Sequence, residues 1–161
     1  MIAAGFLTGI VLLTVWFGGL LDQQRNPNQS PQNNLHEGFV EVVLDRNRQG
    51  HYLFTGAING VPVELLVDTG ATDVVVPEHV ARDLGLVRGR VGFANTANGT
   101  VKVYATTINQ LDLGGIVLLN VPASINPGMG DLEILLGMSA LKHIELTQRG
   151  GTLTLRQHFN Q

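Results

Sequence analysis

The 161 residues carry a formal net charge of −3, 14% charged side chains and no cysteine. This length bounds the chain to about one domain with appendages. Without cysteine the chain has no disulfide, no thiolate metal site and no cysteine nucleophile. A slightly acidic balance without a Lys/Arg cluster also argues against a nucleic-acid partner, so none is expected.

The first segment, Met1–Leu21, contains no charged side chain. About 20 apolar residues are needed to cross a bilayer as a helix, so residues 1–21 predict a single-pass transmembrane anchor. A cleaved signal peptide is the rival interpretation, but it requires a basic start and a small-x-small cleavage site, and neither is clear. Residues 22–34 are rich in Asn, Gln and Pro and predict a flexible linker. The folded unit is then expected over 35–161.

Within that unit the pattern is almost all β. The dipeptides Asn59-Gly60 and Asn98-Gly99 are hairpin signals. One short helix is expected over Glu78–Leu86, after Pro77, and another short helix after Gly137. The expected strands are Phe39–Leu44, His51–Ile58, Val61–Val67, Val74–Val76, Thr100–Tyr104, Thr106–Leu113, Ile116–Ala123, Ile134–Leu136, Ile144–Thr147 and Thr152–Leu155, with a further strand beginning at Gly92.

The most informative stretch is Leu65–Pro77. An apolar β-branched run leads into Asp68, turns through a corner of small residues, and leaves on a second apolar run, Val74–Val76. A carboxylate at the end of a buried strand costs free energy unless it is hydrogen-bonded or paired. For an isolated Asp-Thr-Gly tripeptide, a strand-end Asx-turn is the ordinary explanation. The flanking strands favour a functional carboxylate instead.

A second motif, Ile134-Leu135-Leu136-Gly137, again brings an apolar strand to a glycine corner. The order of strand, glycine-containing turn, strand and corner around Asp68 is echoed before Gly137, and a short helix is expected after each half. This weak echo indicates an internal duplication of one β-rich unit. Only the first half carries the acid, so one chain supplies one such carboxylate.

Together these motifs resemble the retropepsin-like (clan AA) aspartic proteases, most closely the bacterial, membrane-tethered, single-domain type. The resemblance covers about Leu35 to Leu155. It implies a mostly β fold, a closed retropepsin-like barrel with one or two short helices. The residues that it assigns are the catalytic Asp68, the active-site loop Thr69, Gly70, Ala71 and Thr72, the substrate-binding flap Asn95, Thr96, Ala97, Asn98 and Gly99, and the supporting Leu135, Leu136 and Gly137. The flap lacks the run of glycines common in retroviral members.

The chemistry of this class needs two carboxylates that share a proton across a bound water. Because each chain offers Asp68 once, we expect a homodimer that places it against its own copy. The predicted activity is endopeptidase cleavage of a peptide or protein substrate, with no cofactor or metal. The rival function is a catalytically silent dimerisation or peptide-binding module of the same fold. The resemblance also places the protease domain on the periplasmic or extracytoplasmic side of a membrane, where crowding could drive dimerisation.

Other catalytic schemes have little support in the sequence. None of the five histidines stands in a His-Glu-x-x-His pair. Ser139 does not occupy a Gly-x-Ser-x-Gly elbow, because Leu141 stands at the final glycine position. Despite 20 glycines, no glycine-rich phosphate loop with a following Lys and Ser/Thr is present.

Overall fold

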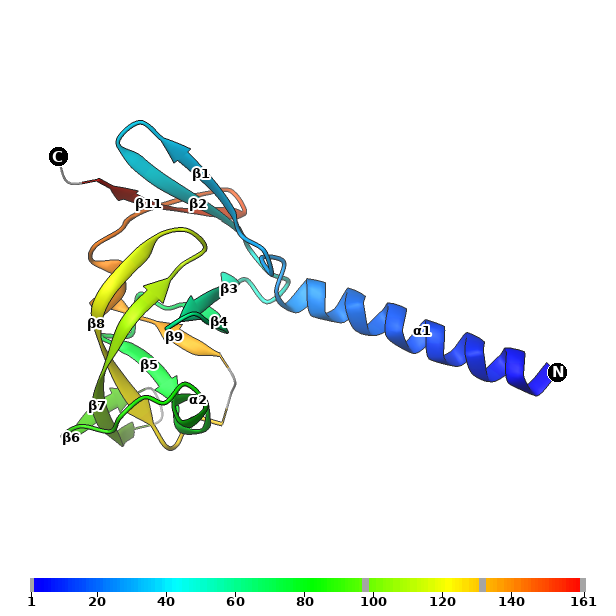
Figure 1. The fold of residues 1–161 in the computed structure, drawn as a ribbon, viewed down its shortest axis with the longest axis horizontal. Helices are drawn as coiled ribbons and strands as arrows, with labels where there is room; N and C mark the ends of the chain where they lie inside the picture. Colours follow the sequence, from blue (N-terminus) through cyan, green and yellow to red (C-terminus); the bar gives the residue numbers. More distant parts are fainter. Residues whose placement is uncertain (1, 97–98, 131–132, 160–161) are drawn as a thin grey trace.

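The computed structural model describes residues 2–96, 99–130 and 133–159. These residues form two β-sheets and three helices (Figure 1). The elements are α1 Ile2–Arg25, β1 Gln32–His36, β2 Phe39–Asp45, β3 Leu53–Ile58, β4 Val61–Val67, β5 Val74–Pro77, α2 Glu78–Asp83, β6 Val91–Thr96, β7 Gly99–Asp112, β8 Val117–Asn126, β9 Ile134–Leu136, α3 Met138–Leu141, β10 Glu145–Arg149 and β11 Thr152–His158.

The larger sheet has the strand order β3-β4-β9-β5-β8-β7-β6. Most neighbours are antiparallel, but β4 pairs in parallel with β9, and β5 pairs in parallel with β8. Each half therefore contributes a hairpin, β3–β4 or β7–β8, and a third strand that pairs beside the hairpin of the other half. This reciprocal exchange matches the duplication that the sequence echo indicates. It also brings the C-terminal ends of β4 and β9 side by side.

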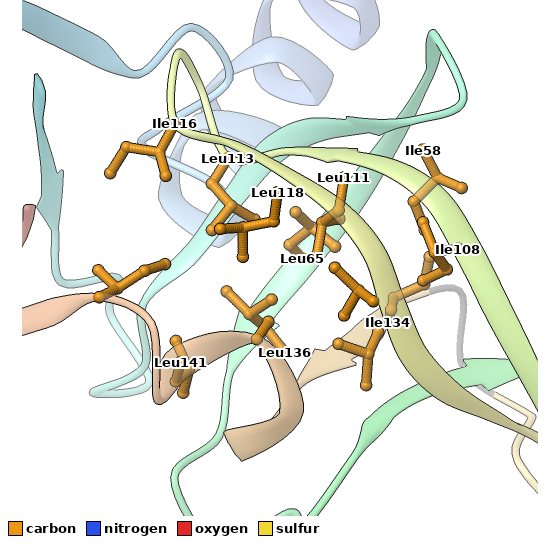
Figure 2. Packing of buried hydrophobic residues seen from close by; sticks show 14 of the residues in the cluster. Ile58, Leu65, Ile108, Leu111, Leu113, Ile116, Leu118, Ile134, Leu136 and Leu141 are labelled. Carbon is orange, nitrogen blue, oxygen red and sulfur yellow. The ribbon is translucent and has the colours of Figure 1, made fainter. Parts of the chain in front are cut away.

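One hydrophobic core lies inside this sheet and beneath the smaller one. Leu65 of β4, Ile134 and Leu136 of β9 and Ile108 of β7 are fully buried in it (Figure 2). Strand β3 also pairs with β7, through only two residue pairs. The sheet is thus strongly curled, and the closed barrel stays a prediction.

The smaller sheet has the order β1-β2-β11-β10 and is antiparallel throughout. Strand β2 alternates in burial, with Val40, Val42 and Leu44 facing inward. On β11, Leu153 and Leu155 are buried in the same way. These side chains join the common core, so the two sheets belong to one folding unit.

Two strands that the sequence separates are continuous in the structure. The predicted strands 100–104 and 106–113 form one strand of 14 residues, β7. The reason is that β7 pairs with β6 over its first part and with β8 over its second, so hydrogen-bonding partners extend across Ala105. The helix expected over Glu78–Leu86 is shorter, because α2 ends at Asp83 and Gly85 adopts a positive φ of 66°.

The N-terminal helix α1 projects away from the two sheets (Figure 1). Its side chains between Ile10 and Leu21 are mostly exposed, among them Trp16 and Phe17. Among the described residues, no helix is both long and apolar enough to span a membrane. The predicted anchor over residues 1–21 and its transmembrane helix find no support there.

The flexible linker predicted over 22–34 differs from the structure. Its first four residues complete α1, and its last three begin β1. Between them, Asn28 is buried: its Nδ2 donates to the carbonyl oxygens of Asp45 and Leu53, both at 2.8 Å, and its Oδ1 accepts from the Asp45 N–H at 2.7 Å. Side-chain amides thus tie this polar segment to the ends of β2 and β3, an effect that an argument from apolar content does not capture.

Candidate active site

Asp68 follows directly after Val67, the last residue of β4. Its N–H donates to the carbonyl oxygen of Leu136 in the neighbouring β9, at 3.1 Å. Its Oδ1 accepts the N–H of Gly70 at 2.9 Å, the Asx-turn that the tripeptide alone suggests. Asp68 is half-buried, whereas Thr69 and Gly70 are exposed. The main chain of Asp68 is thereby bound to β9, and its half-buried carboxylate is held by the Gly70 N–H.

The second motif holds the loop that carries this carboxylate. Because β4 and β9 are parallel, the residues that follow them leave the sheet side by side. The Met138 N–H donates to the carbonyl oxygen of Ala71 at 2.9 Å, and the Ser139 N–H donates to that of Thr72 at 2.8 Å. The start of α3 is therefore hydrogen-bonded to the loop that follows Asp68. The structure thus brings the predicted active-site loop and the predicted supporting residues together.

Gly137 permits this close approach. A Cβ at this position would lie 2.1 Å from the carbonyl oxygen of Asp73 and 2.7 Å from that of Ala71. Its backbone angles, φ −94° and ψ −173°, are accessible to any residue. The requirement for glycine is therefore steric rather than conformational.

Ser139 is a structural partner of the loop that the sequence argument considered only as a nucleophile. Its Oγ accepts the N–H of Val74 at 2.9 Å, and the side chain is 7% exposed. Val74 begins β5, so this bond fixes the point where the chain leaves the Asp68 loop and returns to the sheet. The sequence feature that could have indicated this role is a single polar residue in the otherwise apolar helical turn Met138–Leu141.

The predicted flap corresponds to the hairpin of β6 and β7. Near its tip, Asn95 lies opposite Thr100, Thr96 lies opposite Gly99, and the Thr96 hydroxyl donates to the Gly99 carbonyl oxygen at 2.8 Å. Ala97 and Asn98 lie outside the described residues. Strand β6 lies at one edge of the larger sheet. The Asp68 loop instead connects β4 and β5, which lie on either side of β9. The role of this hairpin in substrate binding stays a prediction.

A cavity of about 290 Å³ lies beside Thr69. The residues that line it are Tyr52, Val67, Thr69, Leu146, Gln148 and Leu153. The Tyr52 hydroxyl is buried and has no hydrogen-bond partner within the part of the chain that the structure describes. A buried hydroxyl without a partner is unfavourable, and an ordered water satisfies such a group as well as a protein atom does.

The family described as "gag-polyprotein putative aspartyl protease" matches residues 54–143, which include the Asp68 loop, the β6–β7 hairpin and Gly137. The chain belongs to this family of aspartyl proteases.

Two curated relatives carry names that state no activity. One, "Uncharacterized protein in cobV 5'region" from Sinorhizobium sp, is 34% identical over 125 residues, which are 74% of this chain and 53% of the relative. The other, "Uncharacterized protein RP867" from Rickettsia prowazekii (strain Madrid E), is 30% identical over 109 residues, 65% of this chain and 46% of the relative. The chain thus spans about half the length of the curated relatives that it matches.

A solved structure is also similar. It is the crystal structure of a retropepsin-like aspartic protease from Rickettsia conorii, with 26% sequence identity and a TM-score of 0.62. The match covers 79% of this chain and 94% of that chain. The fold of the present chain is therefore mostly β and retropepsin-like, as the two sequence motifs indicate.

Proposed function

We propose that this protein is an aspartic endopeptidase whose active site forms when two copies bring their Asp68 carboxylates together. The observation that carries the proposal is the position of Asp68. In a chain of the aspartyl protease family, its carboxylate is held by the Gly70 N–H, on a loop that Gly137 and Ser139 support.

Hydrolysis would proceed through a water held between the two carboxylates. The water oxygen attacks the peptide carbonyl carbon while the ionised Asp68 of one copy accepts a proton from the water. The protonated Asp68 of the other copy donates its proton to the carbonyl oxygen. Collapse of the tetrahedral intermediate breaks the C–N bond: the Asp68 that took the proton from the water donates it to the departing amine, and the other Asp68 recovers a proton from a hydroxyl of the intermediate, which restores the dyad. Two carboxylates at this separation titrate as a coupled pair, so neither has an independent protonation state.

A symmetric dimer agrees with two features of the single chain. The Asp-Thr-Gly motif occurs once in the sequence, so a dyad needs a second copy. Thr69 and Gly70 are exposed in the single chain, so a second copy can pack over them.

An extended peptide is the substrate that a sheet-lined site would accept. Among the described residues, β6 pairs only with β7 and so has a free edge, and its exposed face carries Val91 and Phe93, of which Phe93 is 74% exposed. An extended peptide can hydrogen-bond to such an edge while alternate side chains contact an apolar face. We therefore assign the β6–β7 hairpin to substrate binding. Location of the chain at a membrane, and on its extracytoplasmic side, stays a prediction.

Cleavage by an Asp68→Asn variant tests the proposal. An asparagine keeps the oxygen that accepts the Gly70 N–H but cannot act as acid or base, so the variant should fold normally and lose all peptide cleavage. Asp83→Asn, an exposed change in α2, is the matched control and should leave cleavage unchanged. A diverse peptide library assayed across pH would reveal the activity. Cleavage that persists in Asp68→Asn contradicts the assigned chemistry, and no cleavage by a well-formed wild-type dimer favours a silent binding module.

A further inference from the structure

Arg25, the last residue of α1, joins two glutamates of the folded domain. Its guanidinium NH2 lies 2.5 Å from Glu64 Oε2 and 2.7 Å from Glu133 Oε1. The hydrogen bond with Glu133, followed by the charges of both glutamates, raises the pKa of Arg25. Arginine stays protonated in proteins, so both contacts are ion pairs.

The two glutamates stand at equivalent places in the strands that lead to the active site. Glu64 precedes Leu65 in β4, Glu133 precedes Ile134 at the start of β9, and Leu65 and Ile134 are partners in the parallel pair. Followed in the chain direction, the same strands end at Asp68 and Gly137. Arg25 therefore joins β4 and β9 about 13 Å upstream of the catalytic corner, at about 3.3 Å per residue.

Other contacts hold Arg25 in place. The Asn47 Nδ2 donates to the Arg25 carbonyl oxygen at 2.9 Å. Asn26, which is 2% exposed, donates through Nδ2 to Glu64 Oε1 at 3.3 Å. The C-terminal end of α1 is thus hydrogen-bonded to the domain through several residues, which fixes the position of the Arg25 guanidinium.

We infer that Arg25 is a positioning residue for the catalytic corner, through its joint hold on Glu64 and Glu133. This inference rests on the proposed function, because it concerns the geometry of the Asp68 loop. Strand β9 has only three residues. Because β9 is so short, a displacement of Glu133 at its start also displaces Gly137 at its end. The Asp68 loop, which packs against Gly137, would shift with it. The N-terminal helix thereby becomes part of the catalytic unit.

The chain offers a matched control in its other sheet. Arg156 of β11 also bridges two glutamates, Glu41 at 2.9 Å and Glu145 at 3.8 Å. The pKa of Arg156 is raised as well, mainly by the hydrogen bond with Glu41. The Arg25 side chain is 42% exposed and the Arg156 side chain 34%, so both clusters are partly screened by solvent. The two arginines differ in the strands that they join, and the Arg156 guanidinium also lies over the Phe39 ring, 4.6 Å from its centroid.

Hydrogen exchange of the full-length protein tests the inference without requiring turnover. The Met138 and Ser139 amides, which donate to the Asp68 loop, should exchange about tenfold faster in Arg25→Gln, because the loop opens locally more often. Arg156→Gln should leave these two amides unchanged. Glu133→Gln should reproduce the effect of Arg25→Gln, and Arg25→Lys, which keeps one charge, should restore part of the protection.

Kinetics completes the test. Arg25→Gln should lower kcat several-fold with little change in KM, since the contact positions the reacting carboxylate and does not touch the peptide. Equal effects of Arg25→Gln and Arg156→Gln on the two amides, or no effect of either, would overturn the inference. If amide exchange differs between Arg25→Gln and Arg156→Gln as expected but the wild-type protein cleaves no peptide, the effect of Arg25 on the loop is supported and the proposed function is refuted. Failure of Arg25→Gln to fold leaves Arg25→Lys and Glu133→Gln to decide by the same measurements.

Discussion

Gly137→Ala should damage the active-site loop far more than an ordinary glycine replacement. The added Cβ would lie 2.1 Å from the Asp73 carbonyl oxygen, about 0.9 Å inside the 3.0 Å that real Cβ contacts keep. The three nearest atoms, which all lie within 3 Å, are backbone atoms of Ala71 and Asp73 in the loop after Asp68, so no flexible side chain can move aside. The loop itself must shift.

The expected cost follows from this clash. Overpacking of a rigid site costs about 1–3 kcal/mol. A shift of the loop also weakens the Met138 and Ser139 hydrogen bonds to it, each worth about 1 kcal/mol. We therefore expect Gly137→Ala to lower the free energy of unfolding by about 2–4 kcal/mol and to abolish peptide cleavage at denaturant concentrations where the variant is still folded.

Urea unfolding of the full chain, with cleavage measured in parallel, tests this prediction. Gly151→Ala is the control, because a Cβ at that glycine meets nothing within 4 Å and its φ does not require glycine. The control should change stability by less than about 0.5 kcal/mol. If Gly137→Ala and Gly151→Ala behave alike, the close approach of β9 to the Asp68 loop does not exist in solution.

Two further changes test the polar contacts that hold the fold around the site. Asn28→Ala removes three hydrogen bonds to the ends of β2 and β3 and should cost about 3 kcal/mol of unfolding free energy, whereas Asn34→Ala on the exposed strand β1 should be nearly neutral. Ser139→Ala leaves the buried Val74 N–H without its acceptor and should cost about 1–3 kcal/mol. Chemical denaturation would check both, and a change below 0.5 kcal/mol at Asn28 or Ser139 would contradict the corresponding contact.

The strands nearest the site were predictable from local patterns. The bounds expected for β4, Val61–Val67, and for β9, Ile134–Leu136, are those of the structure. Both are runs of Val, Ile or Leu that end at a corner containing glycine, so periodicity and turn chemistry point to the same limits. The loop around Asp68 and the corner at Gly137 follow from the same signals.

The contacts between elements were harder to predict from the sequence. The parallel pairing of β4 with β9 joins segments about 70 residues apart, and a local pattern cannot specify which strand lies beside which. The roles of Asn28 and Arg25 depend on individual hydrogen bonds between polar side chains and distant strands. Such bonds have no periodic signature, and the polar composition around them favours the prediction of a linker.

Mixing wild-type and Asp68→Asn chains would test the shared dyad most directly. The full-length proteins are combined in equal amounts under conditions that allow subunits to exchange, and cleavage of one peptide is compared with that of the same total amount of wild-type protein. If each active site needs Asp68 from both copies, only dimers of two wild-type chains cleave, and activity falls to roughly one quarter. Activity that stays at about one half would mean that a single Asp68 suffices, which contradicts the proposed mechanism.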